Sequence, residues 1–113
     1  ILNLYEYQSC EPSSSCYFIF YIDLPADLLT VKEEKLFKAA FNIFKDYISF
    51  SNTLSLSKEI KSERFILNFL VSKQQDVYKG QIFRNKDRVY ILMVSNFKGT
   101  KESQAFFDSL SMF

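Results

Sequence analysis

The sequence predicts an α+β fold, in which two helices cover an antiparallel sheet of about five to six strands, in the order ββαβββα. Three observations predict it: β-branched and aromatic runs separated by short turns, one amphipathic helical stretch, and a short helical pattern near the end. Consecutive strands joined by short turns pair antiparallel, and a sheet with apolar faces needs helices to cover it. At 113 residues the chain predicts a single domain, residues 1–113.

The composition excludes several classes of protein. Hydrophobic residues make up 48% of the chain and aromatic residues 18%, which is too apolar for a disordered segment. The net charge of +1 lacks the basic excess of nucleic-acid binders. No apolar run reaches the roughly 18 residues that span a bilayer. The chain opens without a Met, so a removed leader would leave no trace in it, and the compartment stays open.

An antiparallel hairpin is predicted at the start of the chain. Residues 1–8 alternate as in a half-buried strand, residues 11–15 are turn-forming, and residues 17–24 form a β-branched and aromatic run. Cys10 and Cys16 flank this turn. Their placement allows a structural disulfide, two inert thiols or, least readily, a redox pair, since neither a helix N-terminus nor a basic neighbour lowers their pKa.

The middle of the chain predicts an amphipathic helix. Thr30 and Glu33 have the spacing of a capping box, in which each residue caps a backbone amide of the first turn. The apolar residues that follow recur at intervals of three and four, so one helix face must lie on the sheet. They are Leu36, Phe37, Ala40, Phe41, Phe44, Tyr47 and Ile48.

Three further strands and a closing helix complete the prediction. Residues 54–60 alternate weakly, whereas residues 64–71, 77–84 and 88–94 are strong strand patterns. Residues 72–76 and 85–87 are plausible hairpin turns. Thr100 is expected to cap a helix whose apolar positions are Ala105, Phe106 and Leu110.

Three short motifs resemble small bacterial domains of the PsbP/Mog1 kind. Residues 17–25 resemble the "Y-x-V-x-Y-x-D-x-P" opening of those domains, with Asp23 and Pro25 matching. Residues 85–92 resemble their "N-R-L-Y-x-L" hairpin, and residues 106–110 their closing "F-L-D-S-F". Residues 60–65 depart from the usual "G-x-P-G-R-E" stretch.

The resemblance implies an antiparallel sheet with helical cover, commonly in exported proteins of unknown function. PsbP supports photosystem assembly and Mog1 binds a small GTPase. Neither role transfers, because a fold does not carry a function with it.

The sequence offers no catalytic constellation, no cofactor motif and no metal site. It has no His, and two sulfurs alone do not complete a zinc site. Glycine-rich phosphate loops and nucleophile motifs are also missing, so the chain is not expected to be an enzyme. An enzyme would require Glu59, Glu63, Arg64 and Asp108 to converge in space. Asp108 is instead expected to form a structural pair with Arg88.

The surplus of aromatic residues predicts a partner surface. Tyr5, Tyr7, Phe18 and Phe20 lie on the first two strands, and helices in so short a chain would leave part of the sheet uncovered. We therefore expect a non-catalytic interaction module of an exported bacterial protein, periplasmic or in the cell envelope, with a protein partner or a second copy as its target and no nucleic acid. The alternative is a cytosolic adaptor or regulator of Mog1 type.

Overall fold

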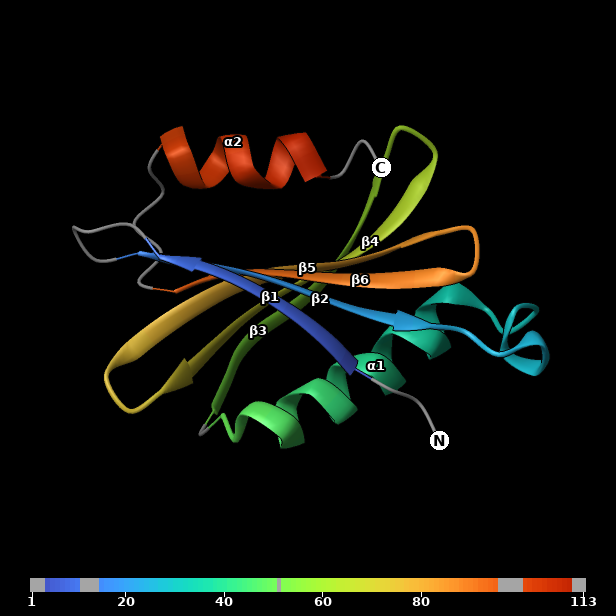
Figure 1. The fold of residues 1–113 in the computed structure, drawn as a ribbon, viewed down its shortest axis with the longest axis horizontal. Helices are drawn as coiled ribbons and strands as arrows, with labels where there is room; N and C mark the ends of the chain where they lie inside the picture. The colour runs from blue at the N-terminus through green and yellow to red at the C-terminus, as the bar shows by residue number, and fades with distance from the viewer. Residues whose placement is uncertain (1–3, 11–14, 51, 96–100, 111–113) are drawn as a thin grey trace.

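A computed structural model describes residues 4–10, 15–50, 52–95 and 101–110 of the chain. Figure 1 shows a strongly twisted sheet between two helices. In chain order the elements are β1 (Leu4–Cys10), β2 (Cys16–Asp23), the 3₁₀-helix η1 (Ala26–Leu28), α1 (Glu33–Ile48), β3 (Asn52–Lys61), β4 (Arg64–Lys73), β5 (Asp76–Asn85), β6 (Arg88–Ser95) and α2 (Lys101–Leu110).

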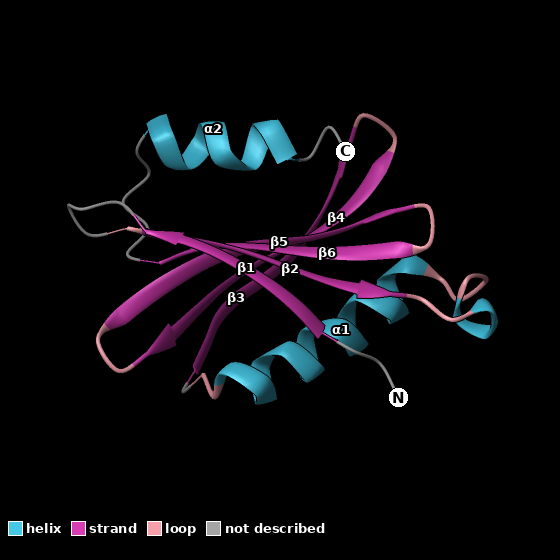
Figure 2. Ribbon diagram, viewed as in Figure 1, coloured by secondary structure: helices cyan, strands magenta, loops and turns pink. Residues whose placement is uncertain are grey.

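The sheet is antiparallel throughout, with the strand order β1-β2-β6-β5-β4-β3. Strands β3 to β6 follow one another as a meander, and the β1–β2 hairpin adds to the free edge of β6. In the pairing of β2 with β6, Tyr21 lies opposite Tyr90. β1 and β3 are therefore the two edge strands (Figure 2).

The larger part of the core lies between α1 and one face of the sheet. The predicted apolar stripe of this helix is buried there from Leu36 to Phe44, and Phe44 is fully enclosed. Ile48 is only partly buried, and Tyr47, which was predicted on the same stripe, is 59% exposed. The Phe44 ring lies 4.8 Å from that of Phe20 on β2 and 5.9 Å from that of Phe69 on β4, measured between centroids. One long helix thus closes most of this face.

A smaller core lies on the opposite face, under α2. Phe107 is 2% exposed and packs against four buried sheet residues, which are Ile66, Phe83, Leu92 and Val94. Figure 1 shows α1 and α2 on opposite sides of the sheet. The predicted class, an α+β domain with an antiparallel sheet and two helices, is confirmed at this level.

The predicted element order is wrong by one strand. Between the two helices the chain forms four strands rather than three, because residues 52–61 make the full-length edge strand β3. All ten residues of β3 are exposed. An edge strand without a buried face leaves no clear hydrophobic alternation in its sequence, which explains why this segment gave only a weak pattern.

The capping box predicted at Thr30 is not formed. Helix α1 begins at Glu33, its N-cap residue is Lys32, and no side chain caps it. The Val31 amide instead donates to the Leu28 carbonyl at 3.3 Å, so Thr30 belongs to the turn after η1. Thr100, the expected cap of the closing helix, lies outside the described residues.

Two hairpin turns lie within the predicted ranges 72–76 and 85–87. Gln74 adopts a positive φ in the β4–β5 turn, and Lys86 does so in the β5–β6 turn. In the β3–β4 turn both Ser62 and Glu63 have positive φ, which is the requirement of a type I′ hairpin.

Candidate functional site

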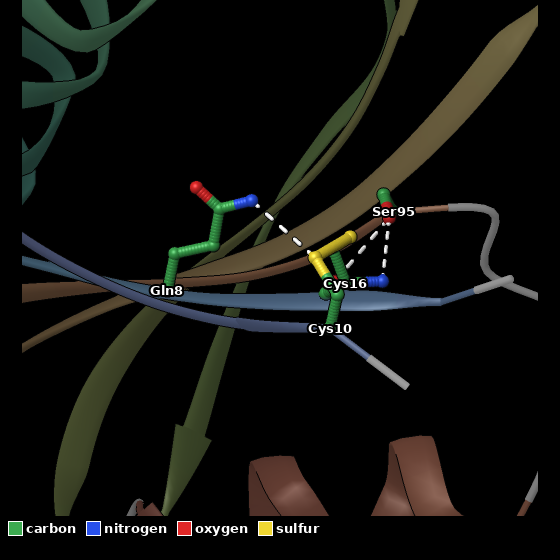
Figure 3. The surroundings of a disulfide bond; sticks show 4 residues. All are labelled: Gln8, Cys10, Cys16 and Ser95. Carbon is green, nitrogen blue, oxygen red and sulfur yellow. Dashed lines mark hydrogen bonds between the residues drawn. A yellow bond between two sulfur atoms is a disulfide. The ribbon is translucent and has the colours of Figure 1, made fainter. Parts of the chain in front are cut away.

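Cys10 and Cys16 are joined by a disulfide at the turn end of the β1–β2 hairpin (Figure 3). They lie directly opposite each other in the register of the two strands. The Cys16 amide donates to the Ser95 hydroxyl oxygen at 2.8 Å, and Gln8 donates to the sulfur of Cys10 at 3.4 Å. Ser95 is buried at the end of β6, so the hydrogen bond from Cys16 links the disulfide-bonded end of the hairpin to this strand.

The four residues predicted as a partner surface do not share one face. Phe20 is fully buried under α1, and Phe18 packs at the edge of the same core. Tyr5 lies opposite Tyr21 and therefore points to the other face, together with Tyr7 two residues later. Tyr5 is 43% exposed and Tyr7 is 72% exposed. Only the two tyrosines remain as candidate contact residues.

A row of aromatic rings continues from Tyr5 across four strands on the α2 side. Tyr5 stacks on Tyr21 with centroids 4.8 Å apart, Tyr21 lies 6.2 Å from Tyr90, and Tyr90 stacks on Phe83 at 5.4 Å. Each pair consists of direct cross-strand neighbours. Phe83 is fully buried, so this aromatic row runs from the core to an exposed edge.

Two arginines lie over the aromatic row. The Arg88 guanidinium carbon sits 4.2 Å from the centroid of Tyr21, and its Nε donates to Asp23 Oδ1 at 2.7 Å. The hydrogen bond to Asp23, and a second one to Tyr90, raise the pKa of Arg88 above its ordinary value. The Arg64 guanidinium carbon lies 5.3 Å from the centroid of Phe83. Two guanidinium groups thus lie over rings of the aromatic row.

A polar groove of about 490 Å³ lies between α2 and the strands β3 to β5. Asn68 donates to Glu59 at 3.2 Å, and the Lys61 ammonium lies 3.3 Å from a carboxylate oxygen of Asp108. Gln104 also donates to this carboxylate, at 3.0 Å. These hydrogen bonds, from Gln104 first and then from Lys61, lower the pKa of Asp108. The groove offers amides, hydroxyls and paired charges.

The four residues considered as a catalytic group make different contacts in the structure. Asp108 and Glu59 lie at the polar groove, Arg64 lies over the aromatic row, and Glu63 is in the β3–β4 turn. Asp108 pairs with Lys61, so its expected pairing with Arg88 is wrong. That arginine pairs with Asp23.

Within residues 4–10, 15–50, 52–95 and 101–110, no three Cys, Asp or Glu side chains gather as metal ligands. None of the described helices combines the length and apolar character that crossing a membrane requires.

Comparison with known proteins shows likeness at the level of the fold. No protein-family model matches the chain, and no curated protein matches its sequence. A solved structure, protein PA94 from Pseudomonas aeruginosa, superposes with a TM-score of 0.52 at 5% sequence identity. The alignment covers 99% of this chain and 81% of that protein, which is described as a protein of unknown function and a candidate regulator. What the two proteins share is the α+β architecture.

Proposed function

We propose that this chain is a non-catalytic binding module of an exported bacterial protein, and that it recognises a protein partner through the exposed end of the aromatic row. The observation that carries the proposal is the exposure of Tyr5 and Tyr7 beside a rigid stack of rings. Tyrosine and arginine dominate the energetics of protein interfaces. Here Arg88 lies over Tyr21, whose ring stacks on that of Tyr5.

Packing alone accounts for the buried end of the row but not for the exposed one. The Phe83 and Tyr90 pair fills the core under α2. Tyr7, in contrast, is exposed over 72% of its surface and lies opposite Ile19 on an edge strand. A tyrosine held on a strand loses little conformational entropy when it binds, so this position suits a contact residue.

The ionisation of the polar groove favours binding over proton transfer. A carboxyl group whose pKa is lowered stays charged near neutral pH and is a poor general acid. Asp108 is such a group, because Gln104 and Lys61 stabilise its charged form. The groove therefore supports hydrogen-bonded recognition beside the aromatic row.

The disulfide supports the exported location. Structural disulfides persist in oxidising compartments and are rare in the cytosol, and Cys10 and Cys16 are joined. The resemblance to PsbP/Mog1 domains supports the same assignment. A cytosolic adaptor of Mog1 type is the alternative, and finding both thiols free in protein isolated from its host would favour it.

The test compares matched tyrosine variants as affinity baits. Tyr5→Ser with Tyr7→Ser removes the exposed end of the row, and Tyr47→Ser is the control, because Tyr47 is 59% exposed on α1. We expect wild type and Tyr47→Ser to retain the same protein from an envelope fraction, and the double variant to lose it by at least tenfold. Loss in both variants, or in neither, would contradict the proposed surface.

Light scattering distinguishes a second copy from another partner. A wild-type dimer that becomes monomeric in the double Tyr5→Ser, Tyr7→Ser variant would identify the partner as this chain itself. A monomer in both cases leaves the envelope protein as the partner. A dimer that persists in the double variant would place the self-contact elsewhere.

A further inference from the structure

An apolar pocket of about 270 Å³ lies on the α1 side of the sheet, away from the aromatic row. Ile22 at the end of β2 and Val89 at the start of β6 line it from the sheet. Leu28 and Val31 line it from the segment between β2 and α1, and Ala39 lines it from the helix. Ligand pockets in proteins measure about 300–1,000 Å³, so this pocket lies just below that range and has room only for a small ligand.

The pocket arises where the helix carries small side chains. Helix α1 packs over β4 and β5, while the segment with η1 covers the neighbouring end of β2. Ala39 and Ala40 are adjacent in the helix at the junction of these two covers. Their methyl groups are too small to fill the space between the helix, this segment and the sheet. A lining this apolar offers few hydrogen bonds to water, so displacing water from it is favourable.

Lys35 is the charged residue among those that line the pocket. It is exposed, so it lies at the rim, and it precedes Ala39 by four residues, which places both on one face of α1. Among the described residues, no carboxylate lies within ion-pair distance of Lys35. An apolar interior beneath a cationic rim is complementary to a hydrocarbon chain that ends in an anion.

We propose that this pocket binds one medium-chain alkyl carboxylate as a monomer, with its chain among Leu28, Val31 and Ile43 and its carboxylate at Lys35. The hydrocarbon chain supplies the affinity, because each buried methylene tightens binding about fourfold. The ion pair at the exposed rim sets the orientation and contributes about two- to fivefold.

A homologous series of ligands tests the proposal on the unaltered protein. Hexanoate, octanoate and decanoate are titrated below their micelle concentrations, by calorimetry and by amide chemical shifts. The dissociation constant is expected to fall about fourfold per added methylene. Shifts are expected at Leu28, Val31 and Ile43 and not at Tyr7. Affinity independent of chain length, or shifts centred on Tyr7, would overturn the proposal.

Variants test the two halves of the site. Lys35→Gln is expected to weaken octanoate two- to fivefold and to strengthen octyltrimethylammonium, because it removes a positive charge next to the head group. Lys38→Gln, which does not line the pocket, is expected to leave both unchanged. Ala39→Phe fills the pocket and is expected to abolish binding. An Ala39→Phe variant that keeps the native circular dichroism spectrum and still binds octanoate would refute the site. Should that variant not fold, the ligand series and Lys35→Gln decide.

Discussion

At the scale of single residues, Gly80 is a position in the sheet that has no room for a side chain. It lies opposite Phe69 in the β4–β5 pair, and the Phe69 ring lies across it. A Cβ atom at Gly80 would overlap that ring. The glycine leaves the space in which Phe69 packs 5.1 Å from Phe41 of α1, measured between centroids. A residue without a side chain thus determines how the helix seats on the sheet.

We expect Gly80→Ala to lower the free energy of unfolding by about 1–3 kcal/mol, the usual cost of overpacking a core. The reason is the displacement of the Phe69 ring, which cannot move without disturbing α1. Urea unfolding measures the change. In the double variant Gly80→Ala, Phe69→Leu the two costs should be clearly less than additive. Strict additivity would show that the ring is not the obstacle.

At the scale of elements, α2 has one buried side chain among those that the structure describes. Phe107 supplies its buried anchor, and Lys61 links it to edge strand β3 through Asp108. Helix α1, in contrast, buries five residues along one stripe. The two helices therefore contribute unequally, and α2 should be the more easily detached.

Phe107→Ala should lower the free energy of unfolding by about 3–5 kcal/mol, since it removes a large buried side chain and leaves a cavity. Phe106→Ala, at a half-buried neighbour, should cost clearly less. Chemical denaturation of both variants provides the comparison. Equal losses would mean that α2 is not anchored chiefly through Phe107.

The Asp108 link should show in the pH dependence of stability. Its folded-state pKa is lowered from 3.8, with the hydrogen bond from Gln104 as the largest cause. The stabilisation is therefore complete above that value and is lost as the pH falls through the folded-state pKa. Wild type should be more stable than Asp108→Asn at pH 7, and the gap should close below pH 3.8.

Thermal midpoints at pH 7, 5, 3.5 and 2.5 measure this gap. Asp27→Asn on η1 is the control for the change in net charge, because Asp27 has no ion pair within the described residues. A gap for Asp108→Asn that widened in acid would contradict the assignment.

At the scale of the whole molecule, the β1–β2 hairpin is the part held least by the meander. It meets the rest of the sheet along β6 alone, and β1 is exposed along most of its length. The disulfide closes this hairpin at its turn, and Ser95 holds the Cys16 backbone to β6. The exposed residues Tyr5 and Tyr7 therefore lie in a hairpin that a disulfide closes.

Reduction of the disulfide should destabilise the protein by about 2 kcal/mol, the chain-entropy value for a loop closed over a separation of six residues. Urea unfolding with and without reductant measures the loss, and the double variant Cys10→Ser, Cys16→Ser should reproduce it without further response to reductant. Amide exchange should accelerate first in β1. Unchanged stability after reduction would show that the hairpin holds its register without the bridge.

Much of this molecule follows from local patterns. One alternating segment and four runs with strong strand patterns predicted five of the six strands. The three- and four-residue spacing predicted the buried face of α1, because burial of one helix face leaves a periodic trace. The full strand β3 and the first residue of α1 were not predicted, because neither leaves a recognisable pattern in the sequence. β3 buries no side chain, and Lys32 takes the N-cap position without a side-chain hydrogen bond.

The candidate site depended on pairings that no local pattern contains. A bridge between Cys10 and Cys16 places Tyr5 opposite Tyr21, so the sequence held a signal for the first pair of the aromatic row. The joining of Tyr21 to Tyr90 required β2 to pair with β6, across about 70 residues of chain. The sequence by itself determined the fold class and which side chains are apolar. Only the tertiary structure decided which of them meet, because strand order and helix placement arise from long-range packing.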